Sequence, residues 1–442
     1  MNDSPMRWNL SRLLLSCCLA AWLLGPIAVL RAEPWPQWRG PRGNGTSRET
    51  GLPTTWSRSE NMLWRVPLPG PAGSTPAVWG DRIFLTSVDD DDLVLLCFTT
   101  DGKPAWRDVL GGGGRVRYRS DEGNNASPSP STDGKHVWAC TSNGLLVCDS
   151  VDGKRVWKID LQERYGPYEI QFGMSSTPLL HQGRLYLQIL HGKMDRTVSK
   201  NSWVVCLDAA TGKELWKQPR NTDAIMENKH SYASPVLYQD DRRSFLLTHG
   251  ADYIIAHRLT DGRELWRCDG INGVDRPYNP FLRLVASPAT GSGVIVVPSA
   301  KNGPVLCLKP DGTGDRTNDS DSYYWKWDRG TPDVPSPLIH DGLVYLLREN
   351  GNLSCVDAKS GRRHYFQQPT ERGRHRASPV YADGKIFTVA RNTGTVCVIQ
   401  AGTQFKILAR NRLGEPMASS PAISGGRIYL RTFSALYAIG TK

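Results

Sequence analysis

Beyond its first 32 residues, the chain lacks any amphipathic stretch with helical periodicity. This absence excludes the common helical folds and favours a protein built from strands. The sequence also lacks a His-Glu-x-x-His pair, a Cys-x-x-Cys pair and a Gly-x-Ser-x-Gly turn. Without them there is no zinc-binding helix, no paired thiol site and no nucleophile turn, so these metal-dependent and hydrolytic activities are without support.

Motifs for nucleic-acid and phosphate binding are absent as well. The glycines at 111–114 are not followed by the Gly-Lys-Ser/Thr and helix of a phosphate-binding loop. The formal net charge is +11, and removing the first 32 residues, which hold three arginines and one aspartate, leaves +9. Such a charge favours anionic glycans, lipid headgroups or acidic proteins as partners, and we do not expect nucleic acid.

What the chain has in abundance is a repeated opening, a serine or threonine followed by a proline that begins a strand. Residues 377–399 show the unit, in which an Asp-Gly turn and an Asn-Thr-Gly turn join three successive strands. The openings recur at intervals of about 49 residues, at Pro76, Pro130, Pro178, Pro235, Pro288, Pro337, Pro379 and Pro421.

Most units close with a glycine followed four residues later by tryptophan, as in Gly102 to Trp106 and Gly212 to Trp216. A fixed period of this length with four strands per unit is typical of a propeller. We therefore predict an all-β fold, an eight-bladed β-propeller of four-stranded antiparallel blades, over residues 62–442. The tryptophans are expected to pack between neighbouring blades.

The two ends of the repeat are incomplete in complementary ways. The last unit, residues 420–439, stops before a closing strand, whereas residues 62–66 resemble a closing strand without a blade. We predict that this N-terminal strand completes blade eight and closes the ring. The Trp/Gly/Pro-rich residues 33–61 are predicted to cover one face of the disc.

The repeat resembles the pyrroloquinoline-quinone-type (PQQ-like) repeat family from about Trp64 to Ile439. The family includes quinoprotein alcohol dehydrogenases and the lipoprotein scaffold of the outer-membrane barrel-assembly machine, so the resemblance implies the fold and leaves two functions open. The dehydrogenases use a vicinal Cys-Cys disulfide and a calcium ion beside PQQ. The only vicinal pair here is Cys17-Cys18, within the first 32 residues.

Residues 1–32 read as a signal peptide, with Arg7 and Arg12 ahead of an apolar run that ends near Leu30. We predict cleavage near Ala32 and a periplasmic or secreted protein. The alternative is an uncleaved membrane anchor, because the run is near the lower length limit for a span. Of the other eight cysteines, six occupy equivalent places in successive units and are predicted to be small core residues.

Candidate ligand-binding residues lie just ahead of the Ser-Pro openings, where loops gather round the central channel. The polar and basic side chains there are Asn124, Asn125, His230, Arg283, His375 and Arg376. Water-filled channel groups are the alternative to a binding site. The run Asp89–Asp92 lacks the alternating ligand pattern of a calcium loop, so no metal site is predicted.

Two hypotheses follow. The first is an exported, non-catalytic propeller, monomeric, which binds a protein or an anionic envelope polymer on its channel face and needs no cofactor. The second is an oxidoreductase that uses PQQ with calcium, or another cofactor, beside His230, Arg283, His375 and Arg376. No catalytic residue can be named from the sequence.

Overall fold

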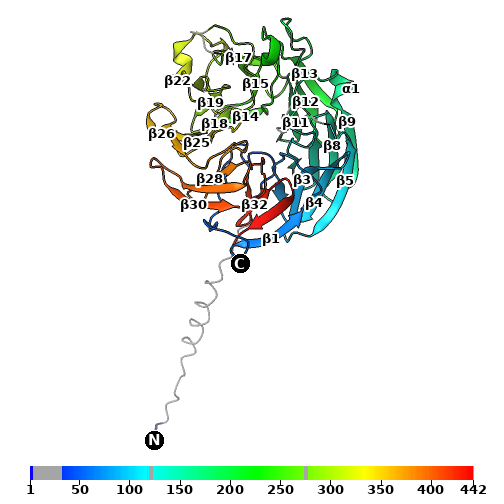
Figure 1. Ribbon diagram of the computed structural model, residues 1–442, viewed down its shortest axis with the longest axis vertical. Helices are drawn as coiled ribbons and strands as arrows, with labels where there is room; N and C mark the ends of the chain where they lie inside the picture. Colours follow the sequence, from blue (N-terminus) through cyan, green and yellow to red (C-terminus); the bar gives the residue numbers. More distant parts are fainter. Residues whose placement is uncertain (3–31, 117, 119–122, 273–276, 442) are drawn as a thin grey trace. The chain divides into compact units, whose positions relative to one another are not determined.

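The computed structural model describes residues 1–2, 32–116, 118, 123–272 and 277–441. Residues 33–442 form one compact unit in which eight antiparallel sheets follow one another around a central axis (Figure 1). The predicted eight-bladed β-propeller is confirmed. The predicted signal peptide lies almost wholly outside the described residues, among which no helix has the length and apolar character needed to cross a bilayer.

Each blade runs from an inner first strand to an outer fourth strand. Blades one to four contain β2 (Ala77–Trp79), β3 (Arg82–Asp89), β4 (Asp92–Thr99), β5 (Pro104–Gly112); β6 (Ser131–Thr132), β7 (His136–Cys140), β8 (Leu145–Ser150), β9 (Arg155–Asp160); β10 (Leu179–His181), β11 (Arg184–Ile189), β12 (Trp203–Asp208), β13 (Glu214–Pro219); and β14 (Val236–Gln239), β15 (Ser244–Gly250), β16 (Tyr253–His257), β17 (Glu264–Cys268). Blades five to eight contain β18 (Ala289–Gly291), β19 (Val294–Pro298), β20 (Val305–Leu308), β22 (Tyr323–Trp327); β23 (Leu338–His340), β24 (Leu343–Leu347), β25 (Asn352–Asp357), β26 (Arg363–Pro369); β27 (Val380–Ala382), β28 (Lys385–Ala390), β29 (Thr395–Gln400), β30 (Ile407–Arg412); and β31 (Ala422–Ser424), β32 (Arg427–Arg431), β33 (Ala435–Ile439), β1 (Met62–Pro67).

Blade four carries one strand more than the repeat predicts. The loop between β20 and β22 of blade five contributes β21 (Gly314–Asp315), which pairs in parallel with the outer edge of β17. This extra strand covers an edge that would otherwise be open. The remaining helical turns are short: α1 (Leu161–Tyr165), η2 (Met226–Lys229) and η3 (Ser320–Ser322).

The ring is closed by β1, as predicted from the incomplete ends. This strand pairs antiparallel with β33, so that Trp64 lies opposite Ala438 and Val66 opposite Leu436. In Figure 1 the blue β1 therefore lies at the edge of the sheet that contains the red β32, with β33 between them. Residues separated by nearly the whole chain thus share one sheet.

The serine or threonine before each repeated proline links its blade to the next around the axis. The backbone N–H of Thr75 donates to Ser129 Oγ at 2.9 Å, and the pattern continues until the N–H of Ser420 donates to Thr75 Oγ1 at 3.2 Å. The closed circle, called the hydroxyl ring below, contains Thr75, Ser129, Thr177, Ser234, Ser287, Ser336, Ser378 and Ser420. The Ser-Pro opening therefore recurs because each copy joins two blades.

Closing tryptophans pack against the glycine turn of the following blade, as expected. The indole N–H of Trp64 donates to Thr100 O at 2.9 Å, and that of Trp216 donates to Leu259 O at 3.1 Å. A Cβ atom on Gly102 would lie 2.7 Å from the Trp64 ring. Only glycine allows this approach, which explains why glycine and tryptophan recur together.

The repeated cysteines lie across the sheet from these aromatic residues. Cys97 pairs with Trp106 and Cys206 with Trp216, and all eight cysteines in the described residues are buried and unbridged. A small side chain opposite each tryptophan leaves room for the indole. Burial raises the pKa of Cys97 and of Cys148 to about 12, so these thiols are protonated core groups.

Candidate functional site

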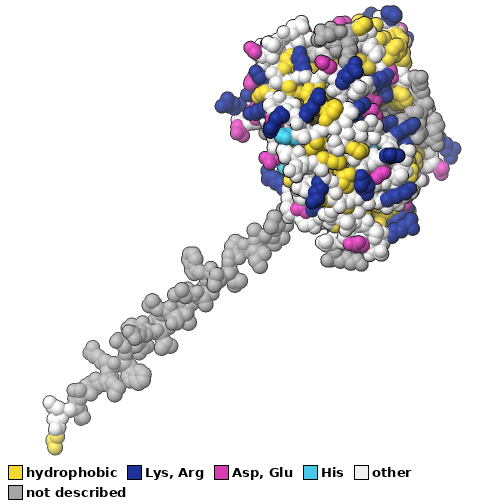
Figure 2. All heavy atoms as spheres, turned by 60° about the vertical axis from the view of Figure 1, so that its left-hand side comes forward, with side chains coloured by type: hydrophobic (Ala, Val, Ile, Leu, Met, Phe, Trp, Pro, Cys, Tyr) yellow, Lys and Arg dark blue, Asp and Glu magenta, His cyan; other side chains and the backbone are white. Residues whose placement is uncertain are grey.

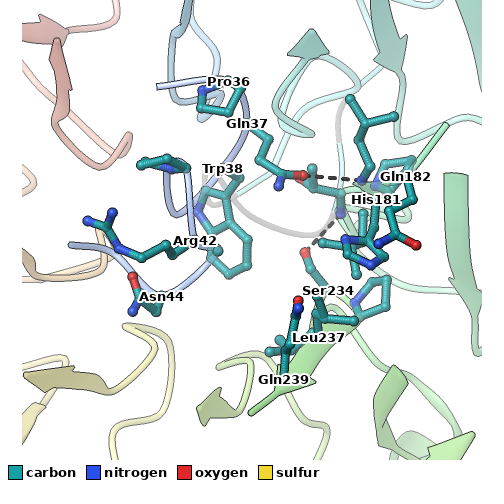
Figure 3. A pocket seen from close by; sticks show the side chains of 18 of the residues that line it. Pro36, Gln37, Trp38, Arg42, Asn44, His181, Gln182, Ser234, Leu237 and Gln239 are labelled. Atoms are coloured by element: carbon teal, nitrogen blue, oxygen red, sulfur yellow. Dashed lines mark hydrogen bonds between the residues drawn. The ribbon is translucent and has the colours of Figure 1, made fainter. Parts of the chain in front are cut away.

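A pocket of about 750 Å³ lies between the N-terminal segment and blades one to five (Figure 3). Residues 33–61, called the cover segment, supply one wall, which includes Pro36, Trp38 and Arg42. The opposite wall is formed by first strands and by the turns that follow them, including His181, Gln182 and Gln239. This volume lies within the range of about 300–1,000 Å³ that is typical of ligand pockets.

The cover segment is held by hydrogen bonds to the inner edges of first strands. Trp35 exchanges two backbone hydrogen bonds with Val78 of blade one, at 2.9 and 2.7 Å. Thr132 of blade two donates its N–H to Pro36 O, and Leu180 of blade three donates to Gln37 Oε1 at 3.2 Å. On the far side of the ring, Tyr381 of blade seven donates to Gly45 O at 2.9 Å.

In blades four and five the cover segment leaves the inner edge of the first strand unbonded. Leu237 and Thr290 lie two residues after the repeated proline, the place that Val78 and Leu180 occupy in their blades. Both line the pocket, and among the described residues the cover segment makes no hydrogen bond to either strand. By this register the backbone N–H groups of Leu237 and Thr290 face the pocket as edge donors. The Leu237 carbonyl already accepts from Thr290 Oγ1 at 3.0 Å.

The pocket combines apolar surfaces with polar groups, of which Arg42 and Asp133 are charged. Pro36, Trp38, Pro178 and Pro235 give it flat apolar walls, and the amides of Gln37, Gln182 and Gln239 add hydrogen-bonding groups. Burial lowers the pKa of His181, which keeps its imidazole uncharged at neutral pH. The arrangement is suited to binding by shape and backbone hydrogen bonds.

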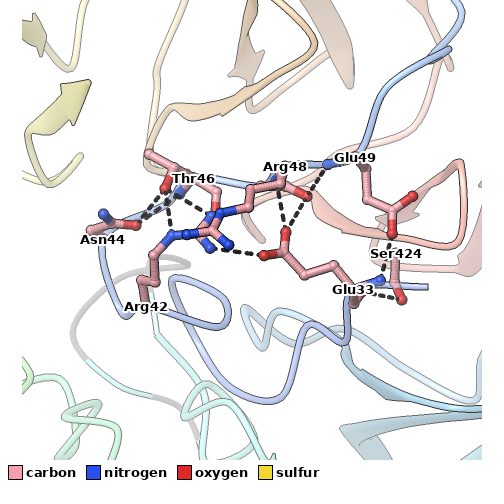
Figure 4. Close-up of polar contacts among 8 residues, drawn as sticks. Glu33, Arg42, Asn44, Thr46, Arg48, Glu49 and Ser424 are labelled. Atoms are coloured by element: carbon pink, nitrogen blue, oxygen red, sulfur yellow. Dashed lines mark hydrogen bonds and ion pairs between the residues drawn. The ribbon is translucent and has the colours of Figure 1, made fainter. Parts of the chain in front are cut away.

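A polar network anchors the start of the cover segment (Figure 4). Arg42 contacts the Glu33 carboxylate at 2.8 Å, and the backbone N–H of Arg48 donates to the same carboxylate at 2.7 Å. Despite its burial, which alone would raise it, the pKa of Glu33 is lowered by these donors. The network fixes Arg42 at the border between this pocket and a second one of about 580 Å³ next to His340 and Tyr381.

Three of the residues predicted from the sequence have structural roles in loops. Asn124 donates to Pro71 O at 2.7 Å, and buried Asn125 accepts from Tyr118 and donates to Gly113 O at 2.9 Å. His230 is also buried, with Nε2 2.9 Å from Gly192 O. Burial lowers the pKa of His230, so it adds no positive charge at neutral pH.

The other three predicted residues differ in their surroundings. The Arg283 guanidinium lies 3.6 Å from the Glu227 carboxylate, and His375 is fully buried with its pKa lowered by burial to about 4. Arg376 alone of the six lines the cavity on the channel axis, which has a volume of about 120 Å³. The structure therefore does not gather the predicted residues into one site.

Bound PQQ and calcium would need more space and more metal ligands than the channel axis offers. A tricyclic quinone needs a pocket of about 300 Å³ or more, and the axial cavity offers about 120 Å³. No group of three His, Cys, Asp or Glu side chains in the described residues is placed to hold a metal ion. Asp89 and Asp92 instead both contact Arg107, at 2.8 and 3.1 Å. The residues around the axis do not fit a bound quinone and calcium.

The hydroxyl ring, the repeated glycine–tryptophan contact and the strand closure define an eight-bladed propeller of the PQQ-like repeat class. The family model described as outer membrane protein assembly factor BamB matches residues 49–193 and 151–404. The chain therefore belongs to this family, and the resemblance found in the sequence is confirmed.

The individual relatives include both an outer membrane protein assembly factor and a dehydrogenase. BamB of Yersinia pestis is 25% identical over 250 residues, covering 52% of this chain and 54% of the relative. Polyvinylalcohol dehydrogenase of Pseudomonas sp is 24% identical over 201 residues, covering 43% of this chain and 30% of the relative. The chain thus spans about half the length of the first and under a third of the second.

Solved structures show the same fold at low identity. BamB from Moraxella catarrhalis superposes with a TM-score of 0.60 and 13% identity, over 86% of this chain and 99% of that one. Quinohemoprotein alcohol dehydrogenase from Comamonas testosteroni gives 0.62 and 12%, over 93% and 81%. These likenesses concern the fold alone.

The pocket beside the cover segment was missed by the sequence analysis, which predicted the cover but placed ligand binding at the other ends of the first strands. One signal was available. Trp38, Arg42 and Asn44 stand in a short segment without strand periodicity. Such segments commonly carry function when a rigid scaffold positions them.

Proposed function

We propose that the protein is an exported, non-catalytic scaffold of the cell envelope that binds an extended segment of a partner protein in the pocket beside the cover segment. The observation that carries this proposal is the pair of backbone N–H groups on the inner edge of blades four and five to which the cover segment does not bind. There Leu237 and Thr290 face the pocket, whereas the cover segment occupies the same edge in blades one to three.

An extended peptide can add itself to a free strand edge through backbone hydrogen bonds. The cover segment does this at blade one, where Trp35 pairs with Val78. A partner segment in the pocket would continue the pattern at blades four and five. Trp38 and the neighbouring prolines would contact its side chains, because flat apolar surfaces suit extended and polyproline-like chains.

Export to the cell envelope has separate support. The signal-peptide pattern of residues 1–32 and the relationship to a protein named for outer-membrane protein assembly favour an envelope location. Basic side chains are spread over the face seen in Figure 2, with acidic ones between them. The net positive charge favours acidic partners.

The alternative is an oxidoreductase that uses PQQ or another cofactor. It is favoured by the sequence relationship to polyvinylalcohol dehydrogenase. The small axial cavity and the lack of a metal ligand set in the described residues weigh against the quinone form.

Photo-crosslinking tests the scaffold proposal. A benzoylphenylalanine introduced at Gln182 or at Gln239, on the pocket wall, is expected to crosslink in cells to the same segment of one envelope protein. The control position is Val156, which is 48% exposed on the outer strand β9. Identical products from Gln239 and Val156, or no protein product from either pocket position, would contradict the proposal.

A further inference from the structure

Successive residues of the cover segment bind successive blades at the inner edge of the ring. Trp35 bonds to blade one, Pro36 to blade two and Gln37 to blade three. The chain then crosses to blade seven, where Gly45 O accepts from Tyr381. Among the described residues, the cover segment makes no hydrogen bond to β14, β18 or β23, the first strands of blades four, five and six. The segment thus runs across the first strands and passes over three blades without pairing.

Each of these three blades presents one backbone N–H donor in the same register. The donors belong to Leu237, Thr290 and Ile339, each two residues after a repeated proline. Ile339 lies opposite Val344, one pair from its hairpin turn, which is the position of Val78 in blade one. A residue at this position of an antiparallel pair directs its N–H away from the neighbouring strand. The first strands of blades four to six therefore offer a row of three edge donors.

The two pockets beside the cover segment form one continuous groove along this row. Arg42, Asn44 and Gly291 line both pockets, which are together called the edge groove below. Leu237 and Thr290 belong to the first pocket and Ile339 to the second. Neighbouring strands among β14, β18 and β23 have Cα atoms within 8 Å of each other. One extended segment can therefore meet all three donors.

The edge groove needs acceptors from its occupant more than donors. At blade four the Leu237 carbonyl already accepts from Thr290 Oγ1 at 3.0 Å, while the Leu237 N–H faces the pocket. Pro36 shows that a residue without an N–H can pair with such an edge, because its carbonyl accepts from Thr132 at 2.8 Å. A polyproline II chain supplies carbonyl groups that are free of internal hydrogen bonds. A proline-rich segment therefore matches the groups that the groove presents.

The ring surfaces of the edge groove suit the same occupant. Half-buried Trp38 lies between Arg42 and His181 in the first pocket (Figure 3). Trp79, on the pocket wall, is 38% exposed and packs so closely on Gly134 that a Cβ atom there would clash with its indole. Grooves lined by aromatic side chains recognise polyproline II segments, because the chain is already extended before it binds.

We propose that the partner segment is rich in proline and lies in the edge groove in the polyproline II conformation, across blades four to six. Its carbonyl groups accept from the N–H groups of Leu237, Thr290 and Ile339, and its rings pack on Trp38 and Trp79. The proposal rests on the scaffold function above, since it names the chemistry of the segment that the scaffold binds.

Fluorescence anisotropy of a labelled decaproline tests this chemistry, beside a labelled ten-residue Gly-Ser repeat. At about 3 Å per residue, the decaproline is long enough to pass all three blades. We expect saturable one-to-one binding of the decaproline, at least about tenfold tighter than binding of the flexible repeat. Leu237→Pro removes the edge donor and no bond of the sheet. It should weaken binding about tenfold more than Leu237→Ala, which shortens the side chain and keeps the donor.

A second pair of variants does not touch the strands' hydrogen bonds. Trp79→Ala removes an exposed ring from the groove wall and should weaken decaproline binding, whereas Val156→Ala, on the outer strand β9, should not. Thermal melts confirm that all four variants are folded. Absence of saturable binding, equal affinities for the two peptides, equal losses in the two Leu237 variants, or unchanged binding in Trp79→Ala would overturn the proposal.

Photo-crosslinking from Gln182 and Gln239 separates this failure from failure of the scaffold function. One crosslinked envelope segment that lacks proline would overturn the proline-rich partner alone. The absence of any crosslinked protein would contradict both the proline-rich partner and the scaffold function.

Discussion

Replacement of Trp64 by alanine is expected to lower the free energy of unfolding by about 3–5 kcal/mol, although Trp64 lies outside every complete repeat. The residue belongs to β1 and packs against the turn of blade one, with its indole N–H bonded to Thr100 O. Its loss leaves a space between blades eight and one and removes one of the two donors to Thr100 O, the other being Arg427 Nη1 at 2.6 Å. Denaturant melts of the purified variant measure the effect.

Trp216→Ala provides the comparison, because Trp216 makes the equivalent contact between blades three and four. Val156→Ala, on an exposed outer-strand side chain, is the control and should change stability by less than about 0.5 kcal/mol. A near-neutral Trp64→Ala beside a severe Trp216→Ala would mean that the contact of β1 with blade one contributes little to closing the ring.

Arg39→Met is expected to release the cover segment from the disc, at a local cost of about 2–4 kcal/mol. The Arg39 guanidinium is 4% exposed and donates to Pro337 O, Pro379 O and Asn44 O. Burial lowers its pKa to about 9, which still leaves it charged at neutral pH. Methionine fills similar volume but removes the guanidinium donor from two buried carbonyl groups, Pro337 O and Pro379 O, and from the half-buried Asn44 O.

Hydrogen exchange at the backbone amides of Trp35 and Gly45 reports on this release. Both amides are bonded in the docked cover segment, to Val78 O and Arg39 O, and both should exchange faster in Arg39→Met. The control is Arg48→Met, because Arg48 has an exposed side chain in the same segment. If Arg39→Met and the unmodified protein protect these amides equally, other contacts hold the cover segment.

The fold was predictable because its contacts repeat locally. Every Ser-Pro opening marks a member of the hydroxyl ring, and Gly102 with Trp64 obeys the same packing rule as Gly262 with Trp216. The repeat period therefore predicts the number of blades and even the strand that closes the ring. The added strand β21 was not predictable, because Gly314–Asp315 pairs with β17 through an insertion that occurs once.

Much less of the candidate site could be predicted from the sequence. The pocket exists because residues separated by about 300 positions meet, as when Arg39 reaches Pro337, and a single sequence carries no record of such contacts. His230 and His375 satisfied the expected polarity of channel loops, yet both are buried. Position ahead of a Ser-Pro opening places a residue near the axis without deciding whether it faces the channel.

Reconstitution with PQQ and calcium tests the central claim that this propeller binds a partner and does not catalyse a quinone-dependent reaction. The purified protein is incubated with both, and its absorption spectrum, melting temperature and dye-linked alcohol oxidation are recorded beside a quinoprotein alcohol dehydrogenase treated in the same way. The account predicts no cofactor spectrum, no change in melting temperature and no oxidation. A saturable cofactor spectrum accompanied by dye-linked alcohol oxidation would contradict it.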